Sequence, residues 1–421
     1  MAKKKQKWLK PRHKFIRIIA LPFLHIYMKM KYRVKIEKFK GKGQYLIISN
    51  HQTAFDQFFV DVAFPGAVYY IASEDLFSIG FVSKIIKYLV APIPIKKSMT
   101  DLRAVLNCVK VAKEGGTIAL FPEGNRTFDG KTVYMKEAIA ALVKKLALPI
   151  AIFRIEGGFG VHPRWSDVVR KGKMRAYVKE VITYDDYKDY SDEELYNIIC
   201  EKLYVDEGKA DGSFYHKKSA EYLERAMYYC PHCGFSEWYS EGDIVSCKKC
   251  GIKVRYLPTK ELDCVNGEFP YRFLTEWYDA QCKFMNGADL SLYKEEAFAS
   301  DVARFSEVIP YNNKQLIAED AKLSVFADRY EIEYNNEKTI LTFDEIVAVS
   351  VLGKNKLNIY AGSRIFQIKS HKRFCAVKYM NMYYRMVRKE DENDEFLGLL
   401  FLGRYKPYCD FAFKFACGKY D

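Results

Sequence analysis

The chain has 421 residues, a formal net charge of +14, and 49% hydrophobic and 15% aromatic side chains. This length can hold two or three domains that each bury a core, and this composition excludes an intrinsically disordered protein. The positive charge gathers at the start of the chain, because twelve basic residues and no acidic residue precede Glu37. The twelve are Lys3, Lys4, Lys5, Lys7, Lys10, Arg12, Lys14, Arg17, Lys29, Lys31, Arg33 and Lys35.

This basic segment contains the apolar run FIRIIALPFLHIYM, residues 15–28. The run is shorter than the roughly 20 apolar residues of a membrane-spanning helix, and Arg17, Pro22 and His25 interrupt it. Basic residues follow it, where a signal peptide would present a small-residue cleavage site. A basic flank beside a short apolar segment is typical of a helix at a membrane interface. Residues 1–36 are therefore predicted to be a basic amphipathic segment that contacts anionic lipids, peripherally or monotopically, on the cytoplasmic face of a membrane. A first helix packed on the core, with a solvated tail, is the alternative.

Short apolar runs alternate with amphipathic stretches between residues 44 and 183. Strands are predicted for the runs YLIIS, AVYYIAS, TIALFPEG and LPIAIFRIEG. Amphipathic helices are predicted for residues 101–116, which end in glycine, and 135–149, which end in proline. This alternation predicts an α/β domain over residues 37–225, with a mixed, partly parallel sheet flanked by helices. The charged and tyrosine-rich residues 185–227 are expected to be helical.

A histidine and an aspartate lie five positions apart in SNHQTAFDQFFV, just after the first of these strands. On one helix they could not share a face, because five positions advance about 140° beyond a full turn. His51 can meet Asp56 only from a loop before the helix, and Ser49, Asn50 and Thr53 are capping residue types that favour such a start. Asp56 would then accept from one ring nitrogen, which leaves the other to take a proton from a substrate hydroxyl. The spacing alone therefore leaves two interpretations open, a catalytic pair and two polar residues that merely open a helix.

A second polar loop follows another predicted strand in IALFPEGNRTFDG, residues 118–130. Gly124 would let the backbone approach a ligand at the carboxyl end of the strand, and the fork of Arg126 suits a phosphate. Taken alone, this pattern indicates a generic anion-binding loop, and a surface turn is a fair alternative.

Together, NHQTAFD and FPEGNRT resemble the glycerolipid acyltransferase family, whose members acylate lysophosphatidic acid. The family pattern is Asn-His-x4-Asp followed by Phe-Pro-Glu-Gly-Thr-Arg-Ser, and here Asn125 and Thr127 replace the threonine and the serine. The stretches APIPIKKS and LPIAIFRIEGG resemble two further family blocks, with lysine in place of the usual arginine in the first. The resemblance implies a catalytic role for His51 and Asp56. It implies substrate-binding roles for Lys96, Lys97, Glu123, Gly124 and Arg126.

The resemblance also implies a role for each of these side chains and a reaction. Arg126, helped by Lys96 or Lys97, would bind the phosphate of the acceptor, and Glu123 would orient its glycerol hydroxyls. The reaction would move a fatty acyl group from acyl-CoA or acyl-carrier protein to the free hydroxyl of a lysophospholipid, foremost 1-acylglycerol-3-phosphate, in phospholipid biosynthesis. The hydroxyl would attack the thioester directly, because the chain has no G-x-S-x-G elbow that would supply a nucleophile. No redox cofactor is expected.

Two alternatives to this function stay open. Glycerol 3-phosphate or another lysolipid could be the acceptor, since the departures at Asn125 and at the lysines leave its identity unsettled. A non-enzymatic nucleic-acid-binding protein is the alternative of another class, because the chain combines a basic tail with a zinc-ribbon pattern. The tail leads directly into an apolar segment, which suits lipid, so no nucleic acid partner is expected.

The cysteines indicate a metal site in a reducing compartment. Seven of the eleven show no pairing pattern, whereas CPHC and CKKC form C-x2-C-x13-C-x2-C, with Gly234 and Gly251 directly after the two pairs. This spacing predicts a zinc ribbon over residues 226–258, in which thiolates fill all four positions and the zinc is structural. Four coincidental structural cysteines are the alternative. The predicted ligands are Cys230, Cys233, Cys247 and Cys250.

The C-terminal part divides into three segments. Residues 259–310 are predicted to be a helical linker, and residues 391–421 an apolar-aromatic tail without a clear period. Between them, residues 311–390 carry short predicted strands closed by one helix, which predicts a smaller β-rich domain. Its element order weakly resembles the pleckstrin-homology-like fold, a small antiparallel barrel or sandwich capped by a helix. The resemblance implies a lipid- or partner-docking module, with the ribbon as a rigid spacer, and an unrelated β domain is the alternative.

Overall fold

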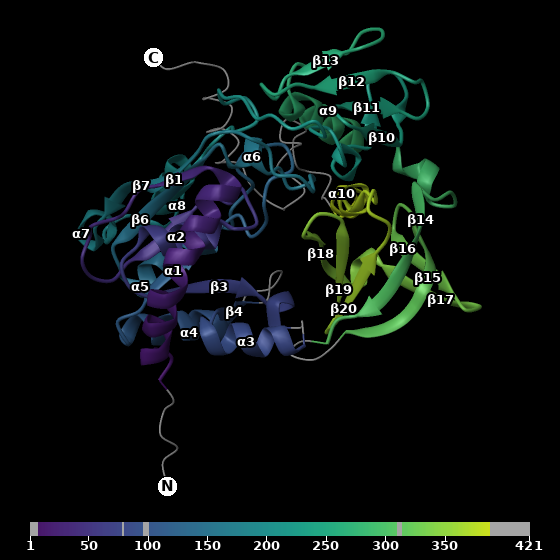
Figure 1. The fold of residues 1–421 in the computed structure, drawn as a ribbon. Coiled ribbons are helices and arrows are strands. Elements are labelled where there is room, and N and C mark those ends of the chain that lie inside the picture. Colours follow the sequence, from purple (N-terminus) through teal and green to yellow (C-terminus); the bar gives the residue numbers. More distant parts are fainter. Residues whose placement is uncertain (1–6, 78–79, 96–100, 310–313, 388–421) are drawn as a thin grey trace.

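The computed structural model describes residues 7–77, 80–95, 101–309 and 314–387 (Figure 1). Lys96, Lys97 and the predicted tail at 391–421 therefore lie outside the described residues, as do the first six residues of the basic segment.

The first half of the chain forms a seven-stranded sheet with the order β1-β7-β6-β2-β5-β3-β4. Neighbouring strands from β6 to β4 run parallel, β7 is antiparallel to β6, and β1 is parallel to β7. The predicted mixed, partly parallel sheet is confirmed. The strands are β1 Val34–Ile36, β2 Leu46–Ser49, β3 Val68–Ser73, β4 Ile93–Ile95, β5 Thr117–Leu120, β6 Ile150–Glu156 and β7 Met174–Ile182.

Helices cover both faces of this sheet (Figure 1). Residues alternate along β2, so that Ile47 packs with α1 and α2 on one face, while Leu46 and Ile48 pack with α4, α5 and α8 on the other. All four residues of β2 are buried, as expected for a strand inside a parallel sheet. The helices are α1 Pro11–Tyr32, α2 Asp56–Ala63, α3 Phe81–Leu89, α4 Leu102–Lys113, α5 Ala138–Leu146, α6 Gly158–Val161, α7 Tyr184–Tyr187 and α8 Asp192–Leu203.

The predicted helical character of residues 185–227 is right only for the first part of this range. After α8 the chain forms turns and the short 3-10 helix Leu223–Arg225. Backbone groups here pair with distant segments instead of with their own helix; Tyr215, for example, exchanges two hydrogen bonds with Lys171. Tertiary pairing has therefore overridden local propensity.

The cysteine-rich segment forms two small sheets and continues past residue 258. Strand β13 adds a fourth antiparallel strand to β10, β11 and β12, and α9 follows it. The elements are β8 Tyr229–Cys230, β9 Gly234–Phe235, β10 Trp238–Glu241, β11 Ile244–Cys247, β12 Lys253–Tyr256, β13 Leu262–Cys264, α9 Leu274–Asn286 and the 3-10 helix Leu290–Tyr293.

The last part is a second seven-stranded sheet, entirely antiparallel, with the order β17-β16-β15-β14-β20-β19-β18 and one closing helix, α10. The predicted β-rich region closed by a helix is confirmed, while its docking role stays a prediction. The elements are β14 Ala299–Glu307, β15 Gln315–Val325, β16 Arg329–Tyr334, β17 Glu337–Thr342, β18 Ile346–Leu352, β19 Lys356–Ala361, β20 Arg364–Lys369 and α10 Ala376–Met386.

The helical prediction for residues 259–310 holds for α9 but is wrong for β14. This strand is central in the second sheet, where it pairs with both β15 and β20. Its register shifts between Ala303 and Phe305 and again at Ser306. Such irregularities break the two-residue period by which a strand is recognised in a sequence.

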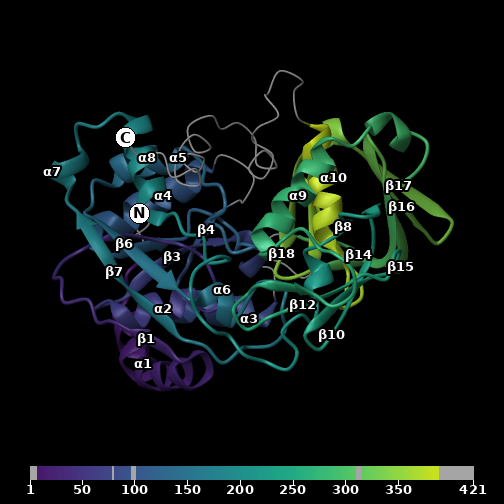
Figure 2. The ribbon, with the colours of Figure 1, turned by 90° about the horizontal axis from the view of Figure 1, so that it is seen from above.

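The cysteine-rich segment packs against the loop after α6 of the first domain and against the second sheet (Figure 2). A single core cluster joins Trp165 of the first domain, Trp238 and Trp277 of the segment, and Phe366 of the second sheet. Asp167 accepts from Arg225 at 2.7 Å and from Lys354, in the turn between β18 and β19, at 2.6 Å. The cysteine-rich segment is therefore part of a shared core rather than a spacer between separate modules.

Candidate active site

Both predicted loops leave the same edge of the first sheet. Strands β2 and β5 are parallel neighbours, so their carboxyl ends lie side by side, where ligands of open α/β sheets bind. Asn50 fixes the first loop to β6, because its amide donates to the carbonyl of Ile155 and accepts from the same residue's N–H, both at 2.8 Å. In the sequence, Asn50 stood out as a capping residue type and as the first residue of the Asn-His-x4-Asp pattern. The structure shows that its side chain holds the His51 loop against β6.

His51 and Asp56 form a hydrogen-bonded pair. Helix α2 begins at Asp56, so His51 lies in the loop before it, as predicted, and its Nδ1 lies 2.9 Å from the buried Asp56 Oδ2. Asp56 also accepts the N–H groups of Gln52 and Thr53 and the hydroxyl of Thr53, at 2.6–3.0 Å. Because all these neighbours donate, Asp56 acts as an ionised acceptor, His51 carries its proton on Nδ1, and Nε2 holds the lone pair.

The start of α2 differs from the capped helix start that the sequence predicted. No side chain caps the start of α2 by hydrogen bonding, and neither Ser49 nor Asn50 serves this purpose. Instead the carboxylate of Asp56 turns back and binds the loop N–H groups that precede it. One side chain thereby shapes the loop and orients the imidazole.

The second loop supports the first. The ring of Phe121 stacks on His51, with centroids 4.6 Å apart and planes at 27°. Glu123 accepts the N–H of His51 on one carboxylate oxygen and that of Val133 on the other, both at 2.8 Å. Burial raises the pKa of Glu123 to about 8, although these two hydrogen bonds lower it. Glu123 therefore positions the His51 loop, and its expected contact with the acceptor's hydroxyls stays a prediction.

Gly124 is required by its backbone conformation. Its φ is +64°, in the left-handed region, while the space that a Cβ would occupy is open. The turn it makes leads the chain from Glu123 toward Arg126.

Arg126, the residue of the predicted anion site, lies close to the His51–Asp56 pair. The residue is 9% exposed, and its Nη1 is buried without a hydrogen-bond partner in the described part of the chain. Burial lowers the pKa of Arg126, whereas the negative charge of Asp56 and the hydroxyl of Tyr32 raise it. Strand β4, which ends at Ile95, is parallel to β3 and so ends at this same edge of the sheet, whereas Lys96 and Lys97 lie outside the described residues.

Comparison with known proteins agrees with this geometry. Residues 31–156 match the family model described as Acyltransferase, a range that includes both loops. The resemblance to acyltransferases is confirmed. This acyltransferase-like domain is similar to 1-acyl-sn-glycerol-3-phosphate acyltransferase BAT2, chloroplastic, of Brassica napus, with 22% identity over 158 residues. The match covers 37% of this chain and 45% of that protein, so the chain spans less than half the length of this curated relative.

A solved structure gives a weaker likeness. The crystal structure of the 1-acyl-sn-glycerophosphate (LPA) acyltransferase PlsC from Thermotoga maritima has a TM-score of 0.38 and 22% identity. The similarity covers 47% of this chain and 81% of that one.

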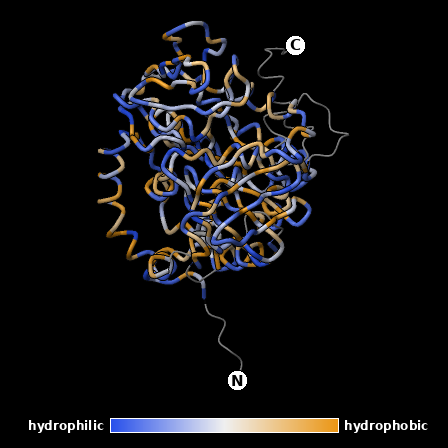
Figure 3. The backbone as a smooth tube through the Cα atoms, turned by 90° about the vertical axis from the view of Figure 1, so that its right-hand side faces the viewer, coloured by the Kyte–Doolittle hydropathy of each residue, from blue (hydrophilic) through white to orange (hydrophobic). Residues whose placement is uncertain are grey.

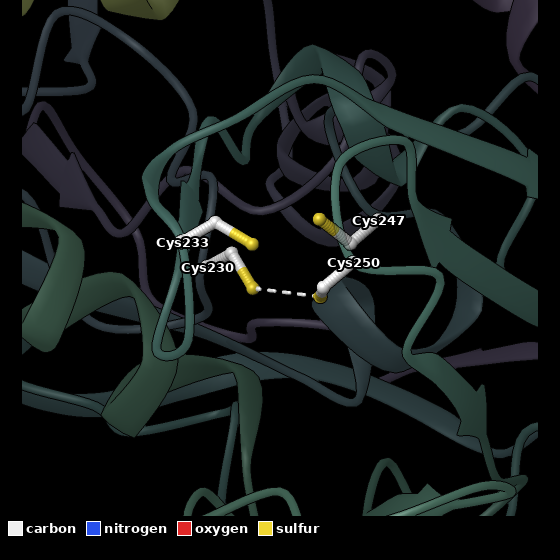
Figure 4. A group of neighbouring side chains, drawn as sticks. All are labelled: Cys230, Cys233, Cys247 and Cys250. Atoms are coloured by element: carbon white, nitrogen blue, oxygen red, sulfur yellow. Dashed lines mark hydrogen bonds between the residues drawn. The ribbon is translucent and has the colours of Figure 1, made fainter.

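Away from the acyltransferase-like domain, the four predicted cysteine ligands converge on one point (Figure 4). Their sulfur atoms lie within 4.8 Å of one another, and Sγ of Cys230 and Cys250 are 3.7 Å apart. Tetrahedral zinc with thiolate bonds of about 2.3 Å places its sulfur atoms about 3.8 Å apart, so the donor set and its spacing fit that ion. Gly234 and Gly251 adopt left-handed φ values of +70° and +76° at the two turns, as predicted. The cluster could therefore hold a metal ion.

Sequence reasoning missed two residues of the candidate active site. Tyr32, in the last turn of α1, and His162, after α6, lie near Arg126. Neither stands in a recognisable pattern, because distant segments bring both residues to the site through tertiary packing.

Proposed function

We propose that this protein is a membrane-associated acyltransferase that moves a fatty acyl group from acyl-CoA or acyl-carrier protein to the free hydroxyl of a lysophospholipid. The proposed acceptor is 1-acylglycerol-3-phosphate, and the pathway is phospholipid biosynthesis. The observation that carries the proposal is the hydrogen bond of His51 to the buried Asp56, together with the buried Arg126, whose Nη1 has no hydrogen-bond partner among the described residues.

The geometry suits direct transfer without a covalent enzyme intermediate. His51 Nε2 accepts the proton of the acceptor hydroxyl while the hydroxyl oxygen bonds to the carbonyl carbon of the thioester. The carbon–sulfur bond then breaks, and the thiolate leaves with the proton that His51 returns. Asp56 stabilises the imidazolium that forms between these steps, and the stack on Phe121 holds the ring in place. Arg126 binds the phosphate of the acceptor.

Acceptor selectivity tests this assignment. We expect the purified protein to acylate 1-acylglycerol-3-phosphate and to use the phosphate-free 1-acylglycerol poorly, because Arg126 then lacks its anion. Arg126→Ala should raise the KM of the phosphate-bearing acceptor at least about tenfold, since hydrogen bonds to charged groups are among the stronger ones. Arg126→Lys should restore little, because a point charge lacks the bidentate fork. Initial rates across a panel of lysolipids and glycerol 3-phosphate, with both donors, measure these effects.

The donor serves as the internal control. Its KM should stay within about twofold of the wild-type value in both Arg126 variants, as expected for a residue that contacts only the acceptor. An equal rise of the two KM values would contradict the assigned role. Higher activity on glycerol 3-phosphate or on another lysolipid than on 1-acylglycerol-3-phosphate would identify that compound as the acceptor instead.

Exposed apolar side chains on α1 and α3 support membrane association. In Figure 3, α1 stands at the left margin with hydrophobic positions along its length. Helix α3 lies against α1, since Arg12 donates to the carbonyl of Tyr88 at 3.1 Å and stacks over its ring. Among the described helices, none combines the length and the hydropathy needed to cross a bilayer. We propose that this surface lies in the interface of an anionic, cytoplasmic membrane face. Its apolar members are Phe15, Ile18, Ile19, Phe23, Ile26, Met30, Phe81, Val82, Ile85 and Tyr88.

Charge reversal on this surface tests the proposal. Ile18 and Phe23 are 70% and 74% exposed, so Ile18→Glu with Phe23→Glu should leave the fold intact. We expect the double variant to bind vesicles of phosphatidylglycerol and phosphatidylcholine about a hundredfold more weakly, because it loses two apolar anchors worth about 1.5–3 kcal/mol each. Leu292→Glu, at an exposed leucine beside the second sheet, is the matched control. Vesicle co-sedimentation measures the binding. Equal binding of wild type, the double variant and Leu292→Glu would show that α1 is an ordinary surface helix without a membrane role.

A further inference from the structure

The surroundings of Arg126 contain more unsatisfied polar groups than one phosphate-binding arginine explains. Burial removes water from the guanidinium of Arg126, which is costly unless hydrogen bonds replace that water. The charge of Asp56 favours the charged guanidinium, but Nη1 has no hydrogen-bond partner within the described chain. A ligand that accepts a hydrogen bond from Nη1 would relieve this cost.

Tyr32 is close enough to this guanidinium for the two side chains to influence each other electrostatically. The side chain is 1% exposed, and its hydroxyl is buried without a hydrogen-bond partner within the described chain. Burial and the charge of Asp56 raise the pKa of Tyr32, and the charge of Arg126 lowers it, so the hydroxyl keeps its proton and can donate. The ring itself is fixed by contacts with Phe55 and Phe59.

His162 is a second neighbour that the charge of Arg126 influences. Its Nδ1 is buried and lacks a partner among the described residues, and its ring centroid is 6.0 Å from that of Tyr32. Burial lowers the pKa of His162 to about 3, and its charged neighbours lower it further because all are cations. The imidazole is therefore neutral and can donate from Nδ1. The neighbours are Arg126, Lys354, Lys31 and Arg170.

We propose that Tyr32 and His162 complete, with Arg126, a binding site for a phosphate monoester, the head group of the acceptor. The three side chains offer a guanidinium fork, a hydroxyl and a neutral imidazole, all able to donate, and the charged neighbours that act on His162 are cations. This inference rests on the proposed function, and it extends the acceptor site to α1 and to a residue beyond the 31–156 family match.

The site links acceptor binding to the surface proposed to meet the membrane. Tyr32 belongs to the last turn of α1, the helix whose exposed face carries Phe23 and Met30. The proposed phosphate site therefore shares α1 with the surface proposed to meet the membrane.

Conservative variants of the full-length protein test this site. Tyr32→Phe keeps the ring and removes the hydroxyl, and His162→Gln keeps a donor of different reach. We expect each variant to raise the KM for 1-acylglycerol-3-phosphate about tenfold, with kcat and the donor KM within twofold of wild type. Tyr27→Phe, at an exposed tyrosine on the same helix, should change none of these values. Unchanged acceptor KM in both site variants would overturn the proposal, and so would a rise confined to the donor KM, which would place a phosphate of the donor here.

A binding measurement separates this proposal from the proposed function. Calorimetric titration with sn-glycerol 3-phosphate should give a dissociation constant about tenfold higher for Tyr32→Phe and His162→Gln than for wild type. If the protein transfers no acyl group but its phosphate binding depends on these residues, the site stands and the proposed function fails. If transfer occurs and glycerol 3-phosphate binds all variants equally, the site is wrong and the function stands.

Discussion

Replacement of His51 by alanine is expected to lower kcat by about 10²- to 10⁴-fold, the usual contribution of a general base. The acceptor hydroxyl would keep its proton during attack on the thioester, and Arg126 would still bind the substrate. We therefore expect both KM values to change little. Thioester consumption by the purified variant, followed through the released thiol, measures the effect.

The fold should survive this change. The side chain of His51 is 21% exposed, and the hydrogen bond to Glu123 comes from its backbone N–H, which alanine retains. His216→Ala, at a partly exposed histidine in a distant loop, is the matched control and should keep wild-type turnover. Near wild-type turnover of His51→Ala, with an unchanged thermal unfolding curve, would exclude His51 as the base.

Loss of the metal is expected to have the second large effect. We predict one zinc ion per chain on the four cysteines, and structural zinc contributes about 10–16 kcal/mol of folding free energy in isolated fingers. Cys247 is buried in the cluster, and its thiolate also lies 3.0 Å from the hydroxyl of Ser236. Cys247→Ser should therefore release the zinc and lower Tm by several degrees or more. Elemental analysis and thermal unfolding measure both changes.

A neighbouring cysteine provides the control. Cys264 lies on β13 of the same sheet but outside the four-cysteine cluster, so Cys264→Ser should keep both the zinc and the Tm. Because the cysteine-rich segment shares its core with Trp165 of the acyltransferase-like domain, loss of zinc should also reduce activity at a raised temperature. Wild-type protein without zinc, or a Cys247→Ser variant as stable as wild type, would contradict this role.

The sequence indicated where the two polar loops begin, because each follows directly after the buried run of β2 or β5. That these strands are parallel neighbours, so that the loops meet at one edge of the sheet, comes from the structure. The spacing of His51 and Asp56 further required His51 to lie in the loop, which is the arrangement in the structure. The four cysteines were predictable for a similar reason, since a metal site fixes short spacings in the sequence.

Other features of the candidate site and of the fold depend on tertiary contacts that no local sequence pattern indicates. The carboxylate of Glu123 accepts hydrogen bonds from the backbone N–H groups of His51 and Val133, and these bonds depend on the tertiary positions of the two loops. The sequence analysis predicted only a contact between Glu123 and the substrate. Tyr32 and His162 come close to one another and to Arg126 from distant parts of the sequence, the end of α1 and the residue after α6. The strand β14 was missed because its register shifts interrupt the alternation of buried and exposed residues.

The central claim is that the His51–Asp56 pair transfers an acyl group to a lysophospholipid beside Arg126. The most direct measurement is mass-spectrometric detection of phosphatidic acid formed from 1-acylglycerol-3-phosphate and an acyl thioester by wild-type protein and by His51→Ala. We predict product with wild-type protein from at least one of the two donors, acyl-CoA and acyl-carrier protein, and at most about a hundredth of that rate with the variant. Equal product from the two proteins, or none from wild type with either donor, would contradict the account.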